Sequence, residues 1–227
     1  MARFDFPQRE SDMGRYVTEM IGTFFLVFVI GMTAVGGSAM APVAIGSVLM
    51  VMVYMGGRVS GAHYNPAVSI AVYMRGALEK SELVPYIASQ LLGAWLAAGA
   101  VLLITGGTFA PAPGADYGTI AVLLAEGLMT FALVLVILNV ATLPATEGNS
   151  YYGLAIGFTV LAGAFAVGPV SGGAFNPAVG FGPVLVDVIA GDGPLINLWM
   201  YIVGPIGGGL LAVPVFRMQN PEETSDA

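Results

Sequence analysis

Six long runs of apolar residues dominate the pattern of the chain. They cover residues 16–36, 41–57, 83–104, 119–141, 151–168 and 195–216. About 20 mostly apolar residues are needed for a helix to cross the ~30 Å hydrocarbon core of a bilayer. Each run therefore predicts a membrane-spanning helix, with the ends of the short second and fifth runs least defined. The pattern as a whole predicts an all-α membrane protein.

Composition agrees with a protein whose surroundings are a lipid bilayer. Of the 227 residues, 57% are hydrophobic and 9% are charged, whereas soluble domains carry about a quarter charged residues. The polar start lacks the apolar core of a secretory signal, so we expect the first run to stay in the mature protein. The absence of Cys excludes disulfides and thiolate metal sites. We expect no cofactor, no metal and no nucleic-acid partner.

The cationic residues predict the orientation in the membrane. They lie before the first run, between the second and third runs, and after the sixth, at Arg3, Arg9, Arg15, Arg58, Arg75, Lys80 and Arg217. Cytoplasmic segments are enriched in Lys and Arg, so both termini, residues 1–15 and the acidic tail 218–227, are predicted to be cytoplasmic. The connection 142–150 has no cation and does not contribute. The protein is expected in the plasma or inner membrane of the cell.

The sequence contains one unit written twice. Residues 18–31 align with 125–138, and residues 59–70 align with 170–181, at offsets of 107 and 111 positions. Each unit holds three spans, so the second unit must enter the membrane from the opposite face. This predicts an inverted repeat about an axis in the membrane plane. Residues 16–217 form one predicted domain, with repeats at about 16–104 and 119–216.

An apolar stretch in each repeat replaces the polar loop expected between its second and third spans. Both stretches begin with Asn-Pro-Ala, namely Asn65, Pro66 and Ala67, and Asn176, Pro177 and Ala178. Asn suits a helix N-cap and Pro suits the first helical position. About ten residues at 1.5 Å each reach half-way across a bilayer. Each stretch therefore predicts a re-entrant half-helix that starts at its Asn.

Inversion brings the N-termini of the two half-helices together near the midplane. Each N-terminus carries about half a positive charge. Each capping Asn has its oxygen committed to the backbone, so we expect its NH₂ group to be free to donate into the space between Asn65 and Asn176. Such a site repels cations and orients a water molecule so that an unbroken proton-conducting chain cannot form.

The doubled box, the starts of spans one and four, and the stretches "SGAHYNPAV", "ASQLLGAW" and "GPIGGGLLA" resemble the aquaporin and aquaglyceroporin (major intrinsic protein) family. The resemblance covers residues from about 15 to 216. It implies six tilted helices and two half-helices around an hourglass pore. It also implies a homotetramer with one pore per subunit and passive flux of water or small neutral solutes.

Three further residues have two readings each. Glu19 and Glu126, one per repeat, are proton-coupling carboxylates in one reading. In the favoured reading they are structural acceptors for N–H groups of the descending loops. His63 is a pH-sensitive gate in one reading, and a residue packed in its loop in the favoured one.

The resemblance places an outer selectivity filter at four positions. These are Ile45, Ala164, Gly173 and Val179. Relatives usually carry Arg at the last position, and water channels commonly carry Phe and His at the first two. The filter predicted here has no charge and no side-chain donor, so it should be wide and apolar. Desolvation of a polyol would then not be offset by hydrogen bonds, and the residues typical of glycerol channels are absent at Gly180 and Val184.

We therefore predict a passive channel for water, and for ammonia, hydrogen peroxide or urea beside it, that excludes protons and ions. The alternatives are a glycerol-type facilitator, a proton- or ion-coupled transporter, and a structural membrane protein that does not conduct. An enzyme is not expected, because no nucleophile, base and orienting group fall together in the sequence.

Overall fold

The structure is a computed structural model that describes residues 12–221. Arg3, Arg9 and the end of the acidic tail, for which we predict a cytoplasmic location, lie outside the described residues. Within the described range every regular element is helical. The long helices are α1 (Asp12–Val35), α2 (Ala41–Ser60), α4 (Lys80–Thr105), α5 (Thr119–Ala141), α6 (Tyr152–Ser171) and α8 (Met200–Gln219).

Two shorter helices, α3 (Pro66–Arg75) and α7 (Pro177–Ala190), interrupt the two series of long ones. Single 3₁₀ turns lie at Pro144–Thr146 and Leu195–Asn197. Among the residues that the structure describes, six helical segments are long and apolar enough to span a membrane, the last of them including the second 3₁₀ turn. The predicted fold class is confirmed, and α1 begins four residues before the predicted first span.

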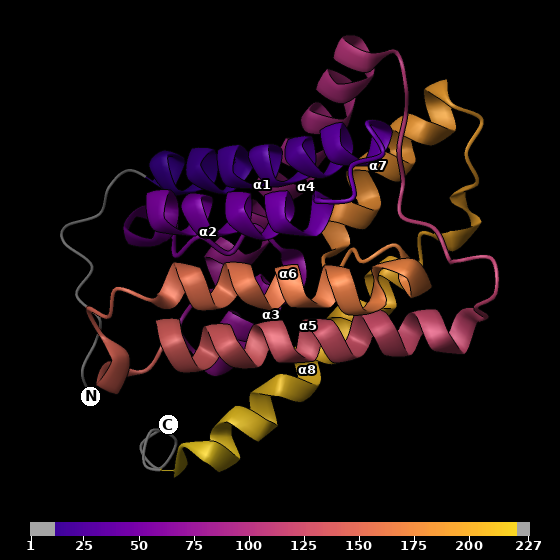
Figure 1. Ribbon diagram of the computed structural model, residues 1–227. Helices are drawn as coiled ribbons and strands as arrows, with labels where there is room; N and C mark the ends of the chain where they lie inside the picture. Colours follow the sequence, from indigo (N-terminus) through magenta and orange to yellow (C-terminus); the bar gives the residue numbers. More distant parts are fainter. Residues whose placement is uncertain (1–11, 222–227) are drawn as a thin grey trace.

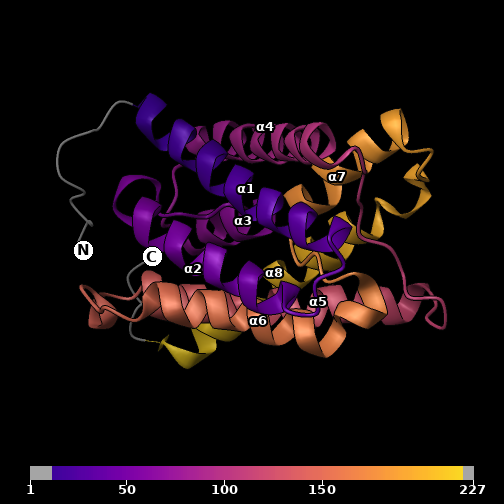
Figure 2. The same cartoon turned by 45° about the horizontal axis from the view of Figure 1, so that its top comes forward.

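The packing of the helices repeats about a two-fold axis. In the first repeat α1 packs on α4 and on α2, and in the second α5 packs on α8 and on α6. Each half-helix packs on a long helix of the other repeat. The helix α3 packs on α8 of the second repeat, and α7 packs on α4 of the first. In Figure 2, α3 lies among the long helices and α7 runs out toward the right-hand end of the molecule.

The two repeats meet where α2 crosses α6, at a pair of glycines. A Cβ atom on Gly46 would lie 2.7 Å from the carbonyl oxygen of Gly157, and one on Gly157 would lie 2.4 Å from that of Gly46. Real Cβ atoms do not approach that closely, so only glycine permits this crossing. The 111-residue offset of the repeats relates the two positions.

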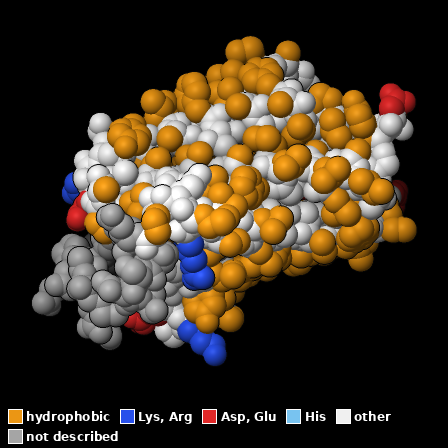
Figure 3. All heavy atoms as spheres, turned by 90° about the horizontal axis from the view of Figure 1, so that it is seen from below, with side chains coloured by type: hydrophobic (Ala, Val, Ile, Leu, Met, Phe, Trp, Pro, Cys, Tyr) orange, Lys and Arg blue, Asp and Glu red, His pale blue; other side chains and the backbone are white. Residues whose placement is uncertain are grey.

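The outer surface suits contact with lipid. Large apolar side chains such as Leu103, Ile120 and Leu211 are exposed, which is the arrangement expected when lipid, rather than water, surrounds the helices. Figure 3 shows one lateral face covered mainly by hydrophobic side chains, with Lys and Arg gathered toward one end. The protein is an integral membrane protein. We name the end where α1 begins and α8 ends the terminal face, and the other end the opposite face (Figure 1).

Candidate functional site: two asparagine-capped half-helices

Each half-helix begins at its asparagine, as the sequence predicts. The Oδ1 atom of Asn65 accepts a hydrogen bond from the Ala67 backbone N–H at 2.9 Å, and Oδ1 of Asn176 accepts one from Ala178 at 2.9 Å. Proline follows at the first helical position in both. The two N-termini face each other, because both asparagines line one cavity.

The expectation that both NH₂ groups are free is wrong in part. Asn65 Nδ2 donates to the carbonyl oxygen of Phe175 at 2.9 Å, and Asn176 Nδ2 donates to that of Tyr64 at 2.8 Å. Each asparagine therefore reaches across the axis to the loop of the other repeat. An amide group has two N–H bonds, so one remains on each asparagine for a solute. These crossed bonds could not be predicted from the sequence, because the residues that they join are 110 and 112 positions apart.

The loops that lead to the asparagines hold an uncommon backbone conformation. Ala62, Tyr64 and Phe175 have positive φ angles of 53°, 49° and 50°, which costs free energy for residues with a side chain. The conformation persists because side chains from other helices bind the loop N–H groups. Carbonyl oxygens of residues 61–63 and 172–174 accept no hydrogen bond within the described chain, so they remain available to water.

Two buried glutamates bind these N–H groups. Glu19, on α1, accepts from the backbone N–H of His63 at 2.9 Å and of Tyr64 at 2.7 Å. Glu126, on α5, accepts from Ala174 at 3.0 Å and from Phe175 at 2.6 Å. Both glutamates are fully buried. This is the geometry of structural acceptors, and neither residue lines the cavity.

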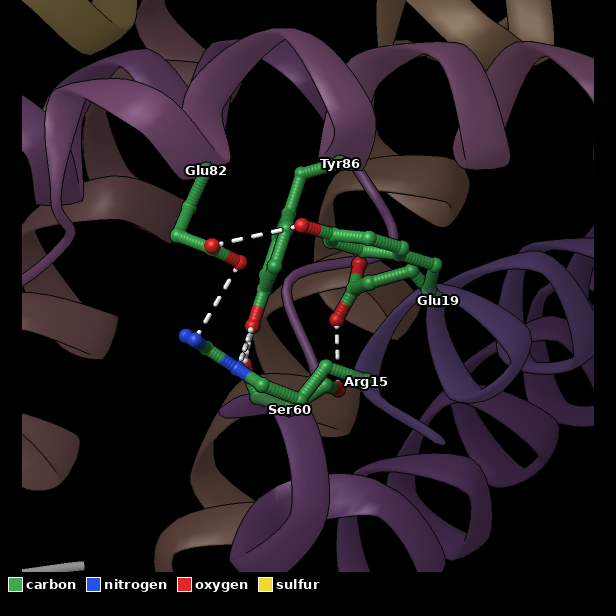
Figure 4. A network of polar contacts seen from close by, with 6 residues as sticks. Arg15, Glu19, Ser60, Glu82 and Tyr86 are labelled. Atoms are coloured by element: carbon green, nitrogen blue, oxygen red, sulfur yellow. Dashed lines mark hydrogen bonds and ion pairs between the residues drawn. The ribbon is translucent and has the colours of Figure 1, made fainter. Parts of the chain in front are cut away.

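A polar network braces the first loop from the terminal face (Figure 4). Tyr86 donates to the carbonyl oxygen of Ser60 at 2.7 Å and accepts from Arg15 Nε at 2.9 Å. Arg15 also forms an ion pair with Glu82 at 3.2 Å, and Ser60 donates to Glu19 at 2.6 Å. In the second repeat, Tyr201 donates to the Ser171 carbonyl at 2.7 Å.

The cavity beside the asparagines is mostly apolar. Its walls consist of Leu26, Ile30, Ile45, Leu49, Ala62, His63, Tyr64, Asn65, Val68, Leu133, Ile137, Ile156, Val160, Gly173, Ala174, Phe175, Asn176 and Val179. Three of the four predicted filter residues, Ile45, Gly173 and Val179, line it together. Ala164 is not in the wall, although it is close to Gly173, because a Cβ on that glycine would be 3.8 Å from the Ala164 Cα.

His63 lies in the connection between α2 and α3, outside the six spans. It lines the cavity and its ring packs 5.2 Å from the ring of Tyr86. Its Nδ1 atom is 3.1 Å from the hydroxyl of Ser69. Burial lowers the pKa of His63 to about 3, and the charge of Arg15 acts in the same direction. The imidazole is thus neutral at physiological pH.

Sequence reasoning assigned no role to Ser69 or Gln90. Gln90 is fully buried on α4, and its Nε2 donates to both Glu19 and Ser69 at 2.8 Å. Gln90 lies in the stretch "ASQLLGAW" of the third apolar run. A polar residue in the middle of an apolar run was the signal that could have identified it.

Fold and site together define an integral membrane protein of the inverted-repeat channel class. A family model described as Major intrinsic protein matches residues 7–216. The chain belongs to the major intrinsic protein family, which is a family of channels and not of enzymes.

Individual relatives agree with this assignment. The chain is 38% identical to aquaporin NIP1-1 of Zea mays over 214 residues, which covers 90% of this chain and 74% of the relative. It is 33% identical to aquaporin AqpM of Methanothermobacter thermautotrophicus, covering 92% of this chain and 98% of that one. The solved aquaglyceroporin of Plasmodium falciparum has the same fold, with a TM-score of 0.82 at 21% identity over 94% of this chain and 99% of that chain.

Proposed function

We propose that the chain is a passive channel for water and for ammonia-sized neutral solutes, and that it excludes protons and ions. The observation that carries this proposal is the pair of Asn-capped half-helices, whose N-termini meet at a cavity with mostly apolar walls. Two helix N-termini present partial positive charge at that point, which opposes the passage of cations, including hydronium.

The remaining N–H group of each asparagine supplies the proton barrier. A water molecule between Asn65 and Asn176 accepts hydrogen bonds from these groups. Its own hydrogens then point away from the midplane, toward the loop carbonyl oxygens on either side. The chain of hydrogen bonds therefore reverses direction at the asparagines, and a proton cannot be passed along it.

The filter residues support a preference for small solutes that need few hydrogen bonds. Ile45, Gly173 and Val179 offer neither charge nor a side-chain donor. Glycerol would lose hydrogen bonds to water there without replacement, which is costly. Water and ammonia lose fewer hydrogen bonds when they enter the filter. We propose urea and hydrogen peroxide as slower solutes and assign glycerol the lowest permeability.

The proposal also includes the location of the protein in the cell and its association into oligomers. The terminal face carries Arg15, Arg58, Lys80 and Arg217, and enrichment in cations supports a cytoplasmic location for it in the plasma or inner membrane. Four copies are proposed to associate as a tetramer with one pore in each subunit.

A solute panel tests the proposed function. Purified protein is reconstituted in liposomes, and stopped-flow scattering or pH traces are recorded for water, ammonia, urea, hydrogen peroxide and glycerol. We expect acceleration over protein-free liposomes for water and ammonia, and none for glycerol. Glycerol flux equal to that of urea would contradict the filter, and an absence of all acceleration would contradict a channel.

A further inference from the structure

The two repeats contribute different side chains to the cavity. His63 lines its first half, whereas the repeat-related position in the second half is Ala174. The 111-residue offset also pairs Ser69 with Gly180. The serine that hydrogen-bonds the imidazole therefore has no counterpart in the second repeat.

The hydrogens around Ser69 can be assigned from the carboxylate outward. Glu19 accepts from four partners, and its Oε2 takes a hydrogen bond from Gln90 at 2.8 Å. A carboxylate only accepts, so the NH₂ end of the Gln90 amide must face it. The second hydrogen of that NH₂ group points to the Ser69 hydroxyl at 2.8 Å. The Ser69 oxygen is therefore an acceptor toward Gln90.

The single hydrogen of the Ser69 hydroxyl then has two available acceptors. One is Nδ1 of His63 at 3.1 Å, and the other is the carbonyl oxygen of Asn65 at 3.3 Å. That carbonyl already accepts the backbone N–H of Ser69 at 3.0 Å. The shorter distance and the occupied carbonyl both favour His63 as the acceptor.

An imidazole that accepts at Nδ1 and is neutral carries its hydrogen on Nε2. The Nε2 atom makes no hydrogen bond to any described residue. It is also not one of the fully buried side-chain atoms, so a solute can reach it. It lies on the side of Gly61, where a Cβ would be 3.2 Å away. Because His63 lines the cavity and its Nδ1 is turned to Ser69, we infer that the Nε2–H group is the part of the ring open to a solute.

We propose that Gln90 and Ser69 hold His63 in its Nε2–H form, so that the half of the pore on the terminal face presents a fixed donor selective for solutes that accept hydrogen bonds. This inference rests on the proposed channel function and adds a specificity-determining residue to it. Ser69 and Gln90 are positioning residues, because they act on the solute through the imidazole.

Charged and titratable groups near the imidazole favour one unchanging state. Arg15 and Glu19 approach from α1, and Tyr86 packs against the ring from α4. Glu19 binds the backbone N–H of His63 and not its ring. The donor should therefore persist between pH 6 and pH 8.

The chain has a single histidine, so its tautomer can be measured directly. Full-length protein labelled with ¹⁵N-histidine in lipid nanodiscs gives one pair of ring nitrogen signals in a long-range ¹H–¹⁵N spectrum. We expect a protonated Nε2 and an unprotonated Nδ1, unchanged from pH 6 to pH 8. In Ser69→Ala we expect a mixture of both tautomers. The control is Ser47→Ala, which changes an exposed serine on α2 and should leave the spectrum as it is.

Flux measurements complete the test. Ammonia is a good acceptor and a poor donor, so Ser69→Ala should lower the ratio of ammonia to water permeability about two- to five-fold, as expected for loss of one neutral hydrogen bond. A wild-type spectrum with a protonated Nδ1, or a Ser69→Ala protein with the wild-type spectrum and ratio, would overturn the inference. Liposomes that pass no solute would contradict the channel, while the spectrum would still report the tautomer.

Discussion

At the scale of single residues, Val179 decides the character of the predicted filter. It lines the cavity beside Gly173, in the first turn of α7. Val179→Arg would introduce a positive charge and five N–H donors into this apolar wall. We expect ammonia and urea permeability to fall more than water permeability, because the added side chain narrows the passage. The ratios are measured in liposomes, and unchanged ratios would argue against Val179 as a filter residue.

Glu126 is the residue on which the second loop depends. Its carboxylate accepts from the Ser171 hydroxyl, the Ala174 N–H and the Phe175 N–H. In Glu126→Gln one oxygen becomes an NH₂ group, which must face a donor and leaves a buried N–H unpaired. We expect a loss of about 1–3 kcal/mol of stability, seen as a lower midpoint of thermal unfolding in detergent, together with lower water permeability.

The matched control for Glu126 is Glu79→Gln. Glu79 is exposed and makes no side-chain capping bond at the start of α4. Its variant should unfold at the wild-type temperature. If both variants behaved like the wild type, the hydrogen bonds of Glu126 would not be holding the loop.

At the scale of helices, the crossing of α2 and α6 is the most constrained contact between the repeats. In Gly157→Leu a side chain would be forced against the Gly46 carbonyl and Met50, whose Cβ lies 2.7 Å from the position of a Cβ on residue 157. We expect destabilisation of about 1–3 kcal/mol or more and a broadened gel-filtration peak. Gly99→Leu on α4 is the control, because no atom lies within 4 Å of a Cβ there, and it should behave like the wild type.

The helices themselves could be predicted from the sequence because their causes are local. The length of an apolar run, the Asn-Pro start of α3 and α7 and the doubled pattern are all visible along the chain. The contacts inside the site could not be predicted in the same way. The bond of Gln90 to Ser69 depends on how α4 packs against α3 within the first repeat, and the bond of Asn176 to Tyr64 depends on how the two repeats approach one another.

At the scale of the whole molecule, the position of the buried carboxylates predicts a passive channel and not a coupled transporter. The buried carboxylates Glu19 and Glu126 are each used by a loop, and neither lines the cavity. Flux should therefore rise linearly with the solute gradient and should not change when a proton or sodium gradient is imposed on the liposomes. Accumulation of a solute against its gradient, driven by either ion, would contradict passive conduction.

The crossed hydrogen bonds of the two asparagines also determine the order in which the parts of the site can assemble during synthesis. Asn65 Nδ2 finds its acceptor at Phe175, 110 residues later in the chain. While the ribosome is still making the intervening helices, the first half-helix has its cap but lacks this partner. A chain is made from its N-terminus, and its parts fold in that order. The two half-helices can therefore meet at the midplane only after nearly the entire protein has been inserted. Neither half of the polypeptide contains a finished pore.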